Sequence, residues 1–318
     1  MQKSPSAVFI GQSPIDVIVR VDDRFLVEND IVKHSTKVID IAESATILKD
    51  LDVLDRIPGG GAANIASMFS QLHGMAIFNG KIADDDEGRL FLKSLSGRGV
   101  HIANDIILDG QKSDLIYTFI TPDNERSFAA CYDVSAKLRF DDLDTDCIGG
   151  ADLLFLEGFL LNNGGGHDVV MKAAKHAKQG EAPTLVAFCP CDPQIIATFP
   201  DKINELLAYV DVLILNEHEA RALYPDQDID SILKKLQSEF LFGALTMGEK
   251  GAHAFSGDDI VFKQAAAIRP EEIVNTNGAG DAFSGGFLHS VLSEKPLSQS
   301  LEIAHQCAIE VLKRPGAR

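Results

Sequence analysis

Apolar residues follow different patterns in the two halves of the chain. In the first half, short apolar or alternating segments at 7–10, 16–21, 38–41 and 113–133 predict strands. Pro122, Asp123 and Asn124 interrupt the last segment, which is typical of a hairpin turn. Helices are expected over 64–74, with Gly74 as the C-cap, and over 87–95, with a short strand at 76–80 between them.

From residue 151 onward, apolar strands alternate with amphipathic helices. The strands are expected at 153–156, 184–188, 212–215 and 244–246. The helices are expected near 167–178, 201–208, 217–223, 230–238, 280–293 and 298–313. Such alternation predicts an α/β fold with a parallel sheet covered by helices on both faces. The segments at 16–21 and 31–41, together with the hairpin, predict a small separate β-sheet, and residues 313–318 are expected to be a frayed end.

Composition and charge narrow the class of protein. A chain of 318 residues can hold one or two domains, and its formal net charge of −18 argues against a nucleic-acid partner. The five cysteines are odd in number and suggest no disulfide framework, so we expect reduced thiols. The N-terminal apolar run is too short for a signal peptide, and no segment approaches the ~20 apolar residues of a membrane span. We therefore expect a cytoplasmic protein without a membrane partner.

Residues 275–287 carry the most informative motif, Asn-Thr-Asn-Gly-Ala-Gly-Asp-Ala-Phe-Ser-Gly-Gly-Phe. Gly278, Ala279 and Gly280 allow backbone amides to approach an anion, and a helix that begins here adds its unpaired amides and dipole. A carboxylate beside such an anion hole, Asp281, makes sense if it accepts the proton of a hydroxyl that attacks phosphorus. A capped helix with packing glycines explains this single stretch equally well.

Four motifs in order extend this interpretation over most of the chain. They are Ile57-Pro-Gly-Gly-Gly-Ala-Ala-Asn-Ile-Ala66, Asn216-Glu-His-Glu219, Thr246-Met-Gly-Glu-Lys-Gly251 and the 275–283 stretch. Together they resemble the signatures of the ribokinase family, the PfkB-type sugar and nucleoside kinases. The resemblance implies a single kinase domain over 1–318 with a ribokinase-like three-layer α/β/α core and a mainly parallel sheet. A β-sheet lid would come from about 14–21, 31–56 and 111–135.

The resemblance also implies roles at the reacting end of the site. Asp281 would be the catalytic base for phosphoryl transfer from ATP to a primary hydroxyl, and the amides of Gly278, Ala279 and Gly280 would stabilise the transferring group. Arg126, in the hairpin, would reach over the phosphates. The residues assigned to the substrate are Asp16, Gln12, Gly59, Gly60, Gly61, Asn64 and Asn277.

The nucleotide and its ions are assigned in the same way. The residues expected at the ATP site are Asn216, Thr246, Gly248, Gly251 and His305, with Cys307 also near the adenine. Glu219 would hold Mg²⁺ through water, although Asn216 and Glu219 also fit a helix capping box. The family usually has Asp where this chain has Asn275, and that Asp helps to hold a monovalent cation. Activation by K⁺ is therefore in question for this chain.

Several functions remain open. Adenosine is the first candidate acceptor, with Phe159 and Tyr132 as candidates to stack on the base, and a ribokinase- or fructokinase-like sugar kinase is the alternative. A non-catalytic binding or regulatory protein with the same fold is supported only by Asn275. A Rossmann dehydrogenase is not supported, because no Gly-x-Gly-x-x-Gly follows the first strand. The resemblance allows a monomer or a homodimer formed through the lid.

Overall fold

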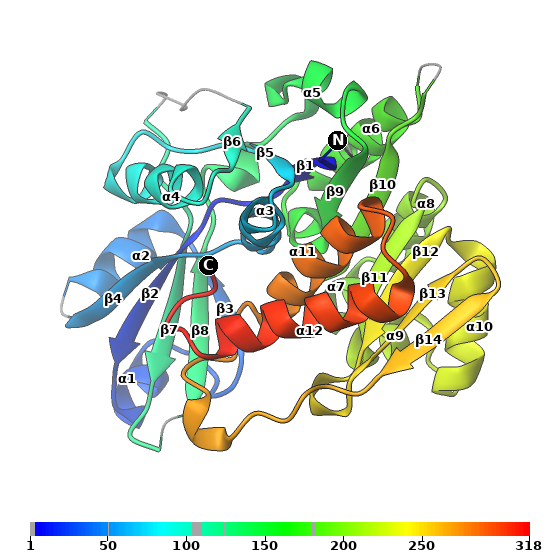
Figure 1. Cartoon of the computed structure of the whole chain (residues 1–318). Coiled ribbons are helices and arrows are strands. Elements are labelled where there is room, and N and C mark those ends of the chain that lie inside the picture. The colour runs from blue at the N-terminus through cyan, green and yellow to red at the C-terminus, as the bar shows by residue number, and fades with distance from the viewer. Residues whose placement is uncertain (1–3, 50, 104–109, 124, 180–181) are drawn as a thin grey trace.

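Two β-sheets of different size make up the framework of the chain (Figure 1). The computed structural model describes residues 4–49, 51–103, 110–123, 125–179 and 182–318. The large sheet has the order β14-β13-β12-β11-β10-β9-β1-β5-β6, and β13 and β14 are antiparallel within an otherwise parallel sheet. Its strands are β1 (Ser6–Ile10), β5 (Met75–Asn79), β6 (His101–Ile102), β9 (Leu153–Glu157), β10 (Leu185–Cys189), β11 (Val212–Asn216), β12 (Phe242–Thr246), β13 (Ala252–Ser256) and β14 (Asp259–Lys263). The predicted α/β class with a mainly parallel sheet is confirmed.

Helices cover both faces of the large sheet. One face carries α3 (Gly61–Gln71), α4 (Asp86–Ser96), α11 (Ala279–Leu292) and α12 (Leu297–Leu312). The other carries α5 (Thr145–Gly149), α6 (Gly166–Ala177), α7 (Pro193–Thr198), α8 (Pro200–Leu207), α9 (Glu217–Leu223) and α10 (Ile229–Glu239). In β1, Phe9 packs on the first face and Val8 on the second, and both are 0% exposed. Among the described residues, no helix combines the length and apolar character needed to cross a membrane.

The small sheet has the order β3-β8-β7-β2-β4 and lies beside the large one (Figure 1). Its strands are β2 (Ile15–Arg20), β3 (Thr36–Ile39), β4 (Val53–Pro58), β7 (Leu115–Ile120) and β8 (Arg126–Cys131). They come from the segments that the sequence assigned to a lid. The predicted hairpin is present, with Ile120 paired to Arg126, but Asn124 of its turn lies outside the described residues.

Two helices connect strands of the small sheet in a region where the sequence predicted no helix. They are α1 (Asp23–Glu28) and α2 (Ile41–Leu48), and each begins after an aspartate whose carboxylate accepts a backbone amide of the first turn. The Asp40 carboxylate accepts from the amide of Glu43 at 2.8 Å, and the Glu43 side chain reaches back to complete a capping box. The pattern Asp-x-x-Glu at 40–43 was therefore the missed indication of a helix.

The prediction for the helix over 64–74 is wrong at both ends. α3 begins three residues earlier, because its N-terminus is capped by a residue distant in sequence, as described below. At the other end the left-handed residue is His73, with φ 70°, and not Gly74. Glycine is needed at 74 for space, since a Cβ there would lie 2.3 Å from the Phe69 ring.

The expected fraying of residues 313–318 is also wrong. The segment 313–318 turns back from α12 and ends between the small sheet and α3 (Figure 1). The Pro315 carbonyl accepts a hydrogen bond from Asn275 Nδ2 at 3.0 Å, and the Arg318 guanidinium donates to Gly59 O at 2.7 Å. The two contacts join residues that are 40 and 259 positions apart, so local sequence gave no indication of them.

Candidate functional site

A cavity of about 730 Å³ opens where the carboxyl ends of the central strands face the small sheet. Ligands of open α/β sheets bind at this edge. Four separate motifs of the sequence meet in the cavity wall. The predicted site residues that line it are Gln12, Asp16, Gly60, Gly61, Asn64, Asn216, Glu219, Thr246, Asn277, Gly278, Gly280 and Asp281.

The N-terminus of α11 forms one end of the cavity. Gly278 is the N-cap and has φ 81°, in the left-handed region that favours glycine. A Cβ on Gly278 would lie 2.3 Å from Ala317 Cβ, whereas a Cβ on Gly280 would meet no atom within 4 Å. Because the first amides of a helix have no partner within it, this turn offers donors and open space to an anion.

Asp281 lies in the same first turn. Its Oδ2 accepts a hydrogen bond from Asn64 Nδ2 at 2.8 Å, so the two glycine-containing motifs are joined at the site. Burial raises the pKa of Asp281 from 3.8 to about 6, while the Asn64 hydrogen bond and the charge of Arg318 lower it. The carboxylate is therefore mostly ionised at neutral pH and remains able to take a proton.

Asp16 stands at the small-sheet side of the cavity, on β2. Burial raises its pKa to about 6; the charge of Arg318 lowers it and the neighbouring Asp281 raises it. A Cβ on Gly59 would lie 3.0 Å from Asp16 Oδ2, so the glycine at 59 lets the backbone run close to this carboxylate. The arrangement leaves two carboxylates facing one cavity, Asp16 from the small sheet and Asp281 from the first turn of α11.

Glu157 is a site residue that the sequence did not single out. It ends β9, is 1% exposed, and accepts the amide of Gln12 at 2.6 Å and the amide of Ala62 at 2.8 Å. It thus caps α3, whose N-cap residue Gly60 has no side chain to do so. Burial raises the pKa of Glu157 to about 7. A polar residue directly after a buried strand was the indication that could have revealed it.

Asn216 and Glu219 line the cavity and also form a capping box. Glu219 Oε2 accepts from the Asn216 amide at 2.9 Å, and Glu219 Oε1 accepts from Asn216 Nδ2 at 2.7 Å. Burial raises the pKa of Glu219 to about 7. Both carboxylate oxygens already have a protein partner, which favours contact with a metal ion through water rather than directly.

The other predicted nucleotide residues differ in whether they line the cavity. Thr246 ends β12 and lines the cavity, whereas Gly248 and Gly251 flank the following turn with φ 58° and 117°, outside the lining. His305 is buried on α12, with its ring centroid 5.4 Å from that of Phe283, and it too lies outside the lining.

Five further predicted residues do not line the cavity, namely Gly59, Cys307, Ala279, Arg126 and Asn275. Ala279 follows Gly278 in the first turn of α11, and Arg126 begins β8 at the far end of the hairpin. Asn275 Oδ1 accepts from the Asn277 amide at 3.0 Å, while its Nδ2 donates to Pro315 O. An aspartate at 275 would lack that donor, and a carboxylate would then face a carbonyl oxygen.

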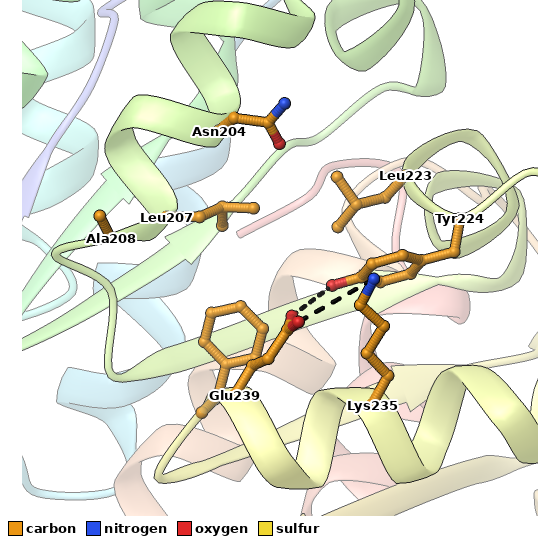
Figure 2. A pocket seen from close by; sticks show the side chains of 8 residues that line it. Asn204, Leu207, Ala208, Leu223, Tyr224, Lys235 and Glu239 are labelled. Atoms are coloured by element: carbon orange, nitrogen blue, oxygen red, sulfur yellow. Dashed lines mark hydrogen bonds and ion pairs between the residues drawn. The ribbon is translucent and has the colours of Figure 1, made fainter.

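A second hollow of about 390 Å³ lies between α8, α9 and α10 (Figure 2). Three of its polar side chains, Tyr224, Lys235 and Glu239, pair with one another. Tyr224 Oη donates to Glu239 at 2.9 Å, and Lys235 Nζ lies 4.5 Å from the centre of the Tyr224 ring and 3.9 Å from a Glu239 oxygen. The large cavity, with its converging motifs, is therefore the candidate active site.

Comparison with known proteins agrees with this geometry. Fructokinase-1 of Zea mays is 27% identical over 297 residues, covering 88% of this chain and 87% of the relative. An adenosine kinase of Dictyostelium discoideum is 23% identical, covering 83% and 81%. The crystal structure of adenosine kinase from Sinorhizobium meliloti superposes with a TM-score of 0.88 at 28% identity, covering 99% of this chain and 96% of the other.

The family model described as "pfkB family carbohydrate kinase" matches residues 28–318, which is nearly the whole chain. The two relatives named above are a fructokinase and an adenosine kinase, and both are kinases. The chain is accordingly a phosphotransferase enzyme and belongs to the pfkB family of carbohydrate kinases.

Proposed function

We propose that the enzyme transfers the γ-phosphoryl group of ATP to a primary hydroxyl of a nucleoside, with adenosine as the first candidate. The observation that carries the proposal is the placement of Asp281 beside the unpaired amides of the α11 N-terminus, inside the cavity. A base and an anion site in one turn of helix are the two requirements of phosphoryl transfer to a hydroxyl.

Asp281 accepts the hydroxyl proton while the oxygen attacks phosphorus, and the carboxyl group then carries that proton away. A pKa of about 6 keeps the base ionised near pH 7 and close to the value at which general bases work best. The amides of Gly278, Ala279 and Gly280 stabilise the charge on the transferring group. In other enzymes, one such donor is worth about 10²–10³ in rate.

The nucleotide would lie along the carboxyl ends of β11 and β12, beside Asn216, Glu219 and Thr246. Mg²⁺ supplies charge neutralisation of the phosphates when bound, and Glu219 would contact it through water, because its two oxygens hold Asn216. Among the described residues, no three His, Cys, Asp or Glu side chains gather into a protein-only metal site.

The composition of the cavity wall supports a neutral acceptor. Five carboxylates line it, from Asp16, Glu157, Asp192, Glu219 and Asp281, and among the described residues its lining includes no lysine, arginine or histidine. A sugar phosphate would bring further negative charge to these groups, which disfavours it. An uncharged nucleoside or sugar does not carry that cost.

The small sheet supports a nucleoside over a free sugar. It contributes the apolar side chains of Val38, Ile116 and Phe128 to the cavity, and Tyr132 and Phe159 complete this side. An apolar, partly aromatic wall suits the face of a purine, whereas a hexose presents hydroxyls that would lose water there without partners. A fructokinase- or ribokinase-like activity is the second candidate, favoured by the Zea mays relative and by Asp16, whose carboxylate can accept two vicinal hydroxyls.

ADP release from Mg·ATP across a panel of acceptors tests the proposal. The panel contains adenosine, other nucleosides, ribose, fructose and fructose 6-phosphate, each with Na⁺ and with K⁺, and Asp281→Asn is the matched inactive control. Turnover on adenosine supports the nucleoside assignment, and turnover on a sugar alone transfers the mechanism to the second candidate. No turnover with any acceptor, while ATP still binds, would establish a binding or regulatory protein.

A further inference from the structure

The guanidinium of Arg318 is fixed at the edge of the active site by contacts with three elements. Nη1 donates to Gly59 O at 2.7 Å and to Asn64 Oδ1 at 2.9 Å, and Nε donates to Ser94 Oγ at 3.0 Å. The group also stacks on the Phe91 ring, 4.8 Å from its centre. Nη2 is buried and has no hydrogen-bond partner among the residues that the structure describes.

The contact with Asn64 determines which way the amide of that residue points. A guanidinium can only donate, so Asn64 must turn its oxygen toward Arg318. Its Nδ2 is then directed to the opposite side, where it donates to Asp281 Oδ2 at 2.8 Å. Arg318, Asn64 and Asp281 thus form a chain of hydrogen bonds that ends on the proposed base.

The charge of Arg318 acts on the same groups. Burial lowers the pKa of Arg318 to about 9, and the carboxylates of Asp16 and Asp281 raise it, so the guanidinium is positively charged at neutral pH. In return, its charge lowers the pKa of both carboxyl groups. Apart from Arg318, the titratable groups on which Asp281 acts are Asp16 on β2, Glu157 on β9, Cys189 at the end of β10 and Glu219 on α9.

We propose that Arg318 is a positioning residue of this active site, which orients the Asp281 carboxylate through Asn64 and balances the negative charge of the cavity. The inference rests on the proposed phosphotransfer function. The positioning role also accounts for the path of residues 313–318 back to the glycine loop at 59–61. The Nη1 atom of Arg318 that donates to Asn64 also donates to the backbone carbonyl of Gly59.

Three variants test the role. Arg318→Met removes the charge and the donors but keeps much of the apolar stem, and Arg318→Lys keeps the charge without the planar fork. Arg314→Met is the matched control, because it removes a cation from the same segment. Arg314 pairs with Glu310 and does not line the cavity. Thermal unfolding of each variant establishes whether the variant is folded. If Arg318→Met does not fold, Arg318→Gln is used in its place.

For Arg318→Met we expect kcat to fall about 10- to 100-fold with a smaller change in KM, because orientation of the base is lost. The acid limb of the kcat/KM profile should move up by about one pH unit, since an opposite charge has been removed. Arg318→Lys should keep the limb near its original pH while kcat stays reduced. A purely structural role would lower the unfolding temperature without moving the limb.

Titration of Asp281 by ¹³Cγ-aspartate NMR provides a readout that does not need turnover, with Asp281→Asn assigning the resonance. If the unmodified enzyme turns over and Arg318→Met matches the Arg314→Met control in kcat and in the pH limb, the inference is overturned and the proposed function stands. If no acceptor is phosphorylated, the proposed function fails. If the titration midpoint of Asp281 is then also the same in the unmodified enzyme and in Arg318→Met, the inference is overturned as well. A midpoint that rises in Arg318→Met alone supports it.

Discussion

Gly278 and Gly280 lie two residues apart at the start of α11, and alanine at each should have opposite consequences. At 280 the new methyl group enters open space on the cavity side, where no atom lies within 4 Å. At 278 it would require a left-handed alanine and would lie 2.3 Å from Ala317 Cβ. One substitution therefore tests the anion hole and the other tests the packing behind it.

The magnitudes follow from these surroundings. A Cβ in the left-handed region costs about 1–2 kcal/mol, and overpacking costs about 1–3 kcal/mol more, so Gly278→Ala should lower the free energy of unfolding by about 2–5 kcal/mol. Gly280→Ala replaces a glycine inside a helix and should raise it by about 0.5–1 kcal/mol. Its methyl group should displace the phosphoryl group by about 1 Å, which costs roughly 100-fold in rate.

Chemical denaturation gives the two unfolding free energies, and ADP release with the best acceptor of the panel gives kcat/KM. We expect Gly280→Ala to be slightly more stable than the unmodified enzyme and about 100-fold less active. An alanine variant at 280 with unchanged kcat/KM would refute the assignment of this turn to the transferring phosphoryl group. A loss of stability at 280 like that at 278 would instead contradict the open space on which the assignment depends.

Four further predictions concern the base, the cation and the acceptor. Because only ionised Asp281 accepts a proton, kcat/KM should rise with pH to a plateau above about pH 6 and fall about tenfold per pH unit below it, as a pH series of initial rates would show. Asp281→Asn should lower kcat by about 10²–10⁴ while calorimetry still detects ATP binding, and equal turnover would remove Asp281 from the mechanism. The side-chain amide of Asn275 already donates to Pro315 O, so turnover of the unmodified enzyme should be the same in Na⁺ and in K⁺. The Asn275→Asp variant should lose turnover in Na⁺ and recover it in K⁺. A requirement for K⁺ in the unmodified enzyme would contradict this prediction. Phe128→Ser should raise the KM for adenosine by about 10-fold and change the KM for ATP little, because the proposal places the acceptor, and not ATP, against Phe128 of the small sheet. Equal increases in the two KM values would instead place ATP against the small sheet.

The motifs alone were enough to predict the family, the class of fold and the part of the cavity wall formed by Gly60, Gly61, Asn64, Asn216, Glu219, Thr246, Asn277, Gly278, Gly280 and Asp281. Glycines before Asp281 are informative because a backbone that must approach an anion tolerates few side chains, and this restriction is local. Asn64, Asn216 and Glu219 were found for the same reason, since each belongs to a short pattern at the end of a strand or the start of a helix. Local patterns likewise predicted the strands of the large sheet from residue 151 to β12.

The tertiary structure decided what depends on contacts between distant segments. Glu157 caps α3 from a different strand, so neither the start of that helix nor the buried carboxylate follows from nearby residues. Arg318 follows a segment whose composition is that of a flexible end, and only its bonds to Gly59 and Asn64 show that it belongs to the site. The free energy of such contacts comes from burial and from partners that lie far away in the chain. For that reason the sequence determined which chemistry is present, and the fold determined which residues hold it in place.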